Sequence, residues 1–166
     1  GHFYAIRTDG KLFAWGDNSY YQLGNSNTTT TYYSSPVAIG TSSWTTIASG
    51  HNSYYTLGIR LGGSLFHWGY DGTMTQGNQF SSPVQIGSST WTAIATVVGF
   101  AAAIRTGGNL FTWGDNSSGQ LGIGTTTSTS SPTIVGSSVW NAIALEGSGS
   151  MMAIKSGGTL WAWGYG

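Results

Sequence analysis

Short apolar and aromatic segments alternate along the chain with turn residues and runs of small polar residues. The first fifty residues contain four such segments, at Phe3–Arg7, Lys11–Trp15, Val37–Ile39 and Trp44–Ala48. The Asp-Gly pair between the first two is a strong hairpin signal, and Pro36 suits the start of an outer strand because it lacks an amide hydrogen. The chain is also rich in aromatic rings and poor in helix formers. The pattern therefore predicts an all-β protein.

Two sequence anchors repeat along the chain. An eight-residue segment that ends in Trp-Gly occurs four times, with its Trp residues 53, 45 and 50 positions apart. Between these copies, Ser-Pro followed by Trp-x-x-Ile-Ala occurs three times, with its Trp at Trp44, Trp91 and Trp140. The repeat unit is therefore about 49 residues long. We divide the chain, as one domain, into repeats at approximately 1–49, 50–98 and 99–148 and a partial repeat at 149–166.

Each repeat contains four short strand segments, and its period lies in the range that is typical of propeller blades. We therefore predict β-propeller blades of four antiparallel strands, about three of them plus a partial fourth, with almost no helix. Trp15, Trp68 and Trp113 should occupy equivalent and largely buried positions, because they recur at matched places. The recurring rings that we assign to the blade core are Trp15, Trp44, Trp68, Trp91, Trp113, Trp140 and Trp163.

A longer motif follows two of the Trp-Gly pairs. Segment 16–24 reads GDNSYYQLG and segment 114–122 reads GDNSSGQLG. Both resemble the G-x-N-x-x-G-Q-L-G signature of the regulator of chromosome condensation repeat family. The second segment matches it at every position, whereas Tyr21 replaces the middle glycine of the first. Gly-His pairs at 1–2 and 50–51 also fit the family pattern, so the resemblance covers essentially the whole chain.

The second repeat departs from this pattern, because its segment 69–77 reads GYDGTMTQG and the signature is degraded. Kelch and WD-repeat propellers are the competing families. Kelch units lack Gln-Leu-Gly after Trp-Gly, and the Trp-Asp pair of WD repeats does not occur in this sequence. The resemblance to the chromosome condensation repeats is therefore the more specific one.

The resemblance implies a propeller of seven blades, and propellers in general need roughly 4–8 blades to pair their edges. Three repeats and a partial fourth would form an open arc with exposed strand edges and an exposed apolar face. The chain begins without Met and stops after a Trp-Gly pair. We therefore expect the remaining blades to come from the same polypeptide or, as the second possibility, from neighbouring subunits.

Composition excludes several classes of function. Five Lys and Arg residues balance five Asp and Glu residues, so the chain lacks the basic surface that nucleic-acid binding needs. The chain has no cysteine and therefore no disulfide or thiolate zinc site. No apolar run approaches the ~18 residues of a membrane span. Aromatic residues make up 14% of the chain, which argues against disorder.

The titratable residues favour structural roles over chemistry. Asp17 and Asp115 follow Trp-Gly at matching positions and Asp71 falls one residue later, which predicts Asx turns. The histidines, for which we expect packing roles, are His2, His51 and His67. No metal-binding His spacing, G-x-S-x-G motif or phosphate-binding loop is present. We therefore predict no catalytic residue, no metal site and no cofactor.

Four tyrosines do not recur between repeats. Tyr20, Tyr21, Tyr32 and Tyr33 flank the polar loop 24–31. Rings without a repeated core position can stack on a sugar or fill a pocket of a protein partner. Packing of the loop against a neighbouring blade is the alternative. We predict these four tyrosines as the candidate binding residues.

These observations predict a non-enzymatic propeller module for protein or glycan recognition or for structural display. The Ser/Thr/Gly-rich, charge-poor repeats are similar to those of secreted surface proteins and of phage tail or other virion appendages. We therefore expect an extracellular or virion-associated setting. A cytoplasmic or nuclear interaction scaffold or small-GTPase regulator is the second possibility, and an enzyme with its site at the central channel is the third.

Overall fold

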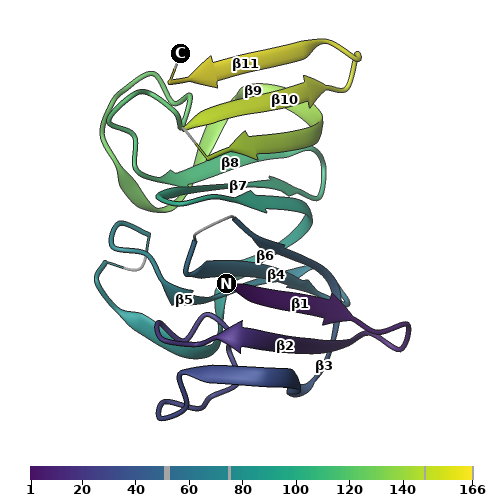
Figure 1. Ribbon diagram of the computed structural model, residues 1–166. Coiled ribbons are helices and arrows are strands. Elements are labelled where there is room, and N and C mark those ends of the chain that lie inside the picture. Colours follow the sequence, from purple (N-terminus) through teal and green to yellow (C-terminus); the bar gives the residue numbers. More distant parts are fainter. Residues whose placement is uncertain (51–52, 75, 148, 166) are drawn as a thin grey trace.

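The computed structural model describes residues 1–50, 53–74, 76–147 and 149–165 (Figure 1). These residues form β-strands and no helix, which confirms the predicted all-β class. Neighbouring strands in the sequence pair with each other in one continuous antiparallel ladder. The strands are β1 (His2–Ile6), β2 (Lys11–Asp17), β3 (Tyr32–Ser49), β4 (Tyr55–Arg60), β5 (Ser64–Tyr70), β6 (Gln79–Thr96), β7 (Phe100–Arg105), β8 (Asn109–Gly114), β9 (Thr129–Glu146), β10 (Ser150–Lys155) and β11 (Leu160–Gly164).

Three strands, β3, β6 and β9, have 18 residues each and run from one sheet into the next. In β3, residues 32–43 pair with β2 and residues 44–49 pair with β4. Gly40 lies between the two halves with φ of 61°, a left-handed conformation that interrupts the extended backbone and favours glycine. Gly87 and Gly136 have the same conformation at the matching positions of β6 and β9. Two of the short segments predicted in each repeat are therefore halves of one strand.

The sheets are stacked blades, and the two central ones have the predicted four strands (Figure 1). These central blades are residues 44–90 and 91–139. The blades at the two ends, residues 1–43 and 140–165, have three strands each among the described residues. Blade boundaries thus differ from the sequence-repeat boundaries, because each Trp-x-x-Ile-Ala segment pairs with the hairpin that follows it. For the same reason, the partial fourth repeat gains a third strand from β9.

The hydrophobic core lies between blades. A sheet buries an apolar face only against another layer, and here each neighbouring pair of blades encloses one cluster. The cluster between the first two blades contains Leu12, Ala14, Leu23, Ile39, Trp44, Phe66 and Trp68. Each blade therefore depends on its neighbours for the burial of its aromatic rings.

The recurring tryptophans are buried to different extents. Trp68 and Trp113 are 0% and 1% exposed, as predicted. Trp15 is only partly buried, so the three positions match in register but are not equivalent in burial as predicted. Its ring stacks on Phe3 at 5.7 Å between centroids, at the end of the arc where no described blade covers it. Trp163, in the blade at the other end, is also only partly buried.

The difference between the two tryptophan sites is measurable. We expect Trp113→Ala to lower the free energy of unfolding by roughly 3–5 kcal/mol, because it empties a closed core site. Trp15→Ala should cost only about 1–2 kcal/mol, since its ring stays partly in water. Urea denaturation of both variants provides the measurement. Equal losses at the two positions would contradict this account of the core.

Candidate functional site

The signature asparagines close the loops that follow Trp-Gly. Asn116 is fully buried, and its Oδ1 accepts a hydrogen bond from the Leu121 N–H at 3.0 Å. Its Nδ2 donates to the carbonyl oxygens of Thr125 and Thr127 at 2.8 and 3.1 Å. Asn18 makes the corresponding bonds in the first repeat. These side chains hold the loop from inside, because their own amide oxygen and nitrogen atoms are hydrogen-bonded to the loop backbone.

The signature carboxylates are turn residues, as predicted. Asp17 Oδ1 accepts hydrogen bonds from the backbone N–H and the hydroxyl of Ser19 at 3.0 and 2.6 Å. Asp115 accepts from the Ser117 N–H at 3.2 Å, and Asp71 accepts from the N–H groups two and three residues further on. Within the described ranges, no group of three or more Asp, Glu or His residues is placed to hold a metal ion. The carboxylates therefore stabilise Asx turns.

The same loops receive the tryptophan of the next blade. Trp68 Nε1 donates to the Gln22 carbonyl oxygen at 2.8 Å, and Trp163 Nε1 donates to the Gln120 carbonyl oxygen at 3.1 Å. Gly24 has φ of 70°, and a Cβ atom there would lie 2.7 Å from the Trp68 ring. The Gln-Leu-Gly part of the signature thus joins one blade to the next.

The second repeat joins its neighbour differently. Its signature is degraded, and the indole of Trp113 donates at 3.4 Å to the hydroxyl of Tyr55. Position 75, in the middle of this loop, lies outside the described residues. A buried tyrosine hydroxyl therefore takes the place of the loop carbonyl that serves the other two interfaces.

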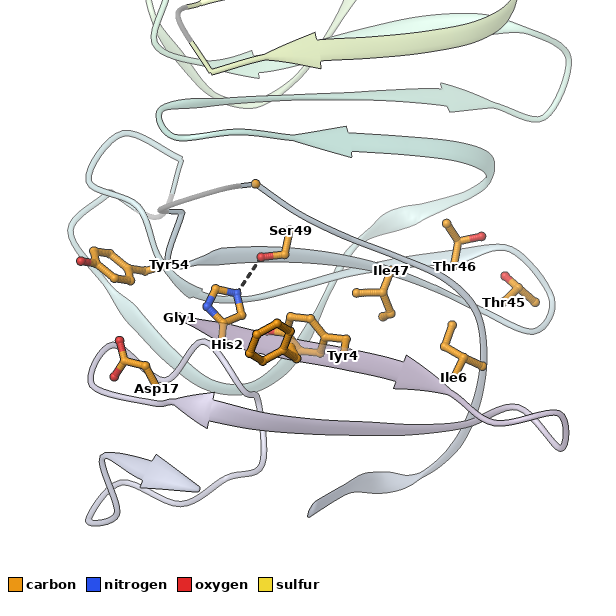
Figure 2. A pocket seen from close by; sticks show the side chains of 12 residues that line it. Gly1, His2, Tyr4, Ile6, Asp17, Thr45, Thr46, Ile47, Ser49 and Tyr54 are labelled. Carbon is orange, nitrogen blue, oxygen red and sulfur yellow. Dashed lines mark hydrogen bonds between the residues drawn. The ribbon is translucent and has the colours of Figure 1, made fainter. Parts of the chain in front are cut away.

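Two of the three histidines have the packing roles expected for them. His2 Nε2 lies 2.7 Å from Ser49 Oγ (Figure 2). The ring of His67 lies beside those of Tyr55 and Phe80, at 5.5 and 4.7 Å between centroids. Burial lowers the pKa of His67 to about 4. His51 lies outside the described residues.

Three tyrosines from different segments stack on one another, and we call Tyr20, Tyr54 and Tyr70 the tyrosine stack. The Tyr20 ring lies 4.3 Å from that of Tyr54 and 5.7 Å from that of Tyr70, with interplanar angles of 28° and 24°. Tyr20 and Tyr54 are 38% and 40% exposed. The stack joins the loop of the first blade to residues of the second and presents aromatic surface to solvent.

Of the four predicted binding residues, only Tyr20 belongs to the stack. Tyr32 is exposed at the start of β3, whereas Tyr33 packs against the core between the first two blades. Tyr21 is partly buried and has φ of 61°, at the position where the third repeat has Gly119 with φ of 74°. The binding role of all four remains a prediction.

The sequence reasoning missed Tyr54 and Tyr70. A signal was present for Tyr70, because it stands directly after Trp-Gly where the first and third repeats have aspartate. Tyr54 occupies a place where the third repeat has glycine. Tyr54 and Tyr70 therefore do not recur between repeats, which is the property by which the four tyrosines of the first repeat were chosen.

A groove of about 970 Å³ lies between β1 and the second half of β3 (Figure 2). Tyr4 and Ile6 of β1 and Ile47 of β3 line it, and Tyr54 lies at one end. Asp17 is the one carboxylate among its lining residues. The remaining lining includes the polar residues His2, Thr45, Thr46 and Ser49, so the groove is of mixed polarity, and one of its walls is β1, the first strand of the ladder.

The stacked blades and their joining loops define an open segment of a β-propeller. The family model described as "Regulator of chromosome condensation (RCC1) repeat" matches residues 9–59 and 107–150. A second model with the same description matches residues 91–120. The chain therefore belongs to the RCC1 repeat family.

Solved structures with the same fold include human WBSCR16, with a TM-score of 0.85 and 22% identity over 99% of this chain. Yeast RCC1 (Prp20), in a structure with Kap60, has a TM-score of 0.80 and 18% identity over 98% of this chain. The ectodomain of the Arabidopsis thaliana receptor kinase ACR4 has a TM-score of 0.63 and 16% identity over the whole chain. This chain spans 45%, 41% and 50% of those three chains, respectively. At these identities the likeness concerns the fold alone.

The loop-closing role of the signature asparagine leads to a stability prediction. Asn116→Ala should lower the free energy of unfolding by about 2–4 kcal/mol, because it leaves buried backbone groups without partners. Ser117→Ala, at the exposed neighbouring position, serves as the control and should change stability by less than about 1 kcal/mol. Thermal and urea denaturation of both variants test this. If Asn116→Ala lowered the free energy of unfolding no more than Ser117→Ala, the loop-closing role of Asn116 would be refuted.

The partly buried His67, whose ring packs between Tyr55 and Phe80, predicts a pH dependence of stability. Its pKa in the folded state lies below its ordinary value, so the unfolded chain binds the proton more tightly. His67 should therefore contribute no penalty above about pH 6.5, and a loss of up to about 1.4 kcal/mol per pH unit as the pH falls from 6.5 to 4. The variant His67→Ala carries the same residue as the matching position Ala14 of the first repeat. It should reduce this dependence of the unfolding free energy on pH. Denaturation series at several pH values measure it, and identical slopes would contradict the prediction.

Proposed function

We propose that this chain is part of a non-enzymatic propeller that recognises a protein partner. The observation that carries the proposal is the contrast between the two kinds of loop residue. The repeated polar residues Asn18, Asn116, Asp17 and Asp115 are all engaged in holding their own loops. The tyrosine stack, by contrast, has no repeated counterpart and exposes aromatic surface. Exposed, rigid tyrosines are typical anchors of protein interfaces.

A strained backbone conformation at Tyr21 supports a binding role for the loop after β2, which carries Tyr20. Tyr21 adopts a left-handed conformation that glycine adopts in the third repeat, at a cost of about 1 kcal/mol or more. The adjacent Tyr20 supplies the ring at the centre of the stack. A tyrosine at position 21 therefore costs conformational free energy that a glycine would not. Strained backbone positions of this kind concentrate at functional sites.

The solved relatives make protein the favoured class of partner. One yeast structure contains Kap60 bound to yeast RCC1 (Prp20), and another study of Prp20p concerns its binding properties to Gsp1p and histones. Those partners belong to the yeast protein. For this chain we take from them only that a propeller of this fold serves as a protein-binding platform.

The proposal extends to how the propeller is completed and to where the protein acts. We propose that residues 1–166 are a segment of one propeller, whose remaining blades come from the same polypeptide or from neighbouring subunits. The charge-poor composition favours an extracellular or virion-associated display role, and an intracellular scaffold or small-GTPase regulator is the second candidate. None of the described residues belongs to a helix that could cross a membrane.

The binding role of the tyrosine stack can be tested by affinity capture with the wild-type chain, a variant and a control. We expect Tyr20→Ser, combined with Tyr54→Ser, to reduce recovery of a specific partner from an extract of the source organism by about tenfold or more. Gln85→Leu, at an exposed position of β6, is the matched control and should leave recovery unchanged. Quantitative mass spectrometry of the captured proteins provides the measurement. Equal recovery by the wild-type chain, the double tyrosine variant and Gln85→Leu would contradict the proposal. Tyrosine-dependent binding to an oligosaccharide array would instead identify a glycan as the ligand.

A further inference from the structure

The cations of this charge-poor chain all lie at one end of the blades. Lys and Arg occur five times in the sequence, as Arg7, Lys11, Arg60, Arg105 and Lys155. Each belongs to one of the hairpins that join β1 to β2, β4 to β5, β7 to β8 and β10 to β11. These hairpins lie on one side of the molecule, on the right in Figure 1. We call this side, residues 7–11, 60–64, 105–109 and 155–159, the hairpin edge.

The carboxylates have the opposite distribution. Asp9 is on the hairpin edge, where it pairs with Arg7 at 2.6 Å. The other four acidic residues lie at or directly after the opposite ends of the strands, and they are Asp17, Asp71, Asp115 and Glu146. In the part of the chain that the structure describes, no carboxylate forms an ion pair with Arg60, Arg105 or Lys155. These three cations are therefore available to a carboxylate from another molecule.

Aromatic rings contact the cations of the hairpin edge and limit their freedom. The Arg60 guanidinium lies 3.8 Å from the ring centroid of Phe66, and the Arg105 guanidinium lies 4.9 Å from that of Phe111. Lys155 contacts a ring in the same way. A cation on an aromatic ring keeps its charge but is already ordered before a ligand arrives. The edge thus presents ordered cations on successive blades.

A cavity of about 350 Å³ lies beside Arg105. Trp91 and Phe111 contribute aromatic rings to its lining, and Ser89 and Ser131 contribute hydroxyl groups. None of the described residues that line it is acidic. A cation and hydroxyl donors beside apolar walls suit an acidic side chain, because its carboxylate can accept hydrogen bonds while its methylene groups contact the rings.

An exposed leucine adds an apolar contact to the same edge. Leu61 is 74% exposed, the highest value among the large apolar side chains of the described residues. The matching hairpin positions are Thr8, Thr106 and Ser156, so the repeat does not require leucine here. Leu61 follows Arg60 directly, in a central blade that has a neighbour on each side. Its exposure therefore does not depend on the ends of the ladder.

We propose that the hairpin edge binds an acidic segment of a protein partner, whose carboxylates contact Arg60 and Arg105 and whose apolar side chains contact Leu61. Arginine suits this ligand because its planar N–H groups match the two oxygen atoms of a carboxylate. The tyrosine stack lies at the opposite ends of the strands, where Tyr20 follows β2 and Tyr70 ends β5. The two surfaces are therefore separate.

Two other occupants fit the hairpin edge less well. Nucleic-acid binding commonly involves about six to ten phosphate contacts, and this edge has five cations, one of which is already paired. The acidic residues of a second copy are also unsuited. Asp17, Asp71 and Asp115 already accept hydrogen bonds from their own loops.

A peptide-binding experiment tests the proposal. The probe is a fluorescent peptide of repeated Glu-Glu-Leu, added to the 166-residue chain. We expect saturable binding by fluorescence anisotropy, and this binding should weaken as sodium chloride is added, because salt screens exposed charges. A peptide of the same length built from Gln-Gln-Leu should bind roughly tenfold more weakly or worse. One built from Glu-Glu-Ser should bind roughly threefold more weakly.

Protein variants locate the binding site. Arg60→Gln and Arg105→Gln should each weaken binding of the Glu-Glu-Leu peptide roughly threefold or more, whereas Arg105→Lys keeps the charge and should retain most of it. Leu61→Ser should weaken binding of this peptide and leave that of the Glu-Glu-Ser peptide unchanged. Tyr20→Ser should leave both unchanged, so a failure of this proposal is distinct from a failure at the tyrosine stack. Thermal denaturation verifies that each variant is folded.

A charge-relocation variant is the matched control. Thr28→Lys, combined with Arg105→Gln, returns the lost charge to the exposed loop 24–31 at the opposite ends of the strands. Binding should remain as weak as in Arg105→Gln alone, because the position of the charge matters and not the net charge. Full restoration of binding would contradict a local site.

Several outcomes would overturn the proposal. These are the absence of saturable binding up to about 1 mM peptide, equal binding of the Glu-Glu-Leu and Gln-Gln-Leu peptides, and binding that neither arginine substitution affects. Arginine-dependent binding of a single-stranded oligonucleotide that is tighter than that of the peptide would assign the edge to nucleic acid instead. Salt-sensitive self-association that Arg60→Gln and Arg105→Gln abolish would assign it to a second copy of the chain.

Discussion

The burial of one blade's indole beneath the loop of the blade before it is the contact on which the structure depends. Trp68 lies at the first interface, where its N–H reaches the Gln22 carbonyl and its ring lies in the shared core. Neither blade could bury this ring alone, because each is a single sheet. Stability is therefore carried by contacts between neighbours, as in other repeat architectures. Among the described residues, the first and the last blade have one such interface each.

This constraint explains which residues repeat. The Asn, Gln and Gly of the signature shape a loop whose carbonyl and backbone surface receive the next indole. Gly122 shows the steric part of this requirement, since a Cβ atom there would lie 2.5 Å from Trp163 Nε1. The repeated Asn, Gln and Gly positions are consequently committed to their own loops and to the indole of the next blade. The proposed recognition role therefore falls to residues that differ between repeats, such as those of the tyrosine stack.

The sequence was sufficient to predict the class, the four-stranded blades and the turn role of the carboxylates, because each depends on local chemistry that recurs. It could not show that residues 37–39 and 44–48 are halves of one strand, because pairing partners are set by tertiary contacts. The stack of Tyr20 with Tyr54 and Tyr70 was also inaccessible. These rings are far apart in the sequence and meet only when the second blade packs on the first.

Two kinds of exposed aromatic and apolar surface result, and the repeats distinguish them. Phe3 is 60% exposed, whereas the matching Thr56, Ala101 and Met151 are fully buried. Phe3 lies in the first blade, which has one neighbouring blade among the described residues, so its exposure goes with the place of that blade in the ladder. Tyr20 is exposed although the loop that carries it is complete and its neighbouring blade is present. The place of a blade in the ladder does not account for the exposure of Tyr20, because both blades of its interface are described, so the tyrosine stack is the surface on which recognition is best sought.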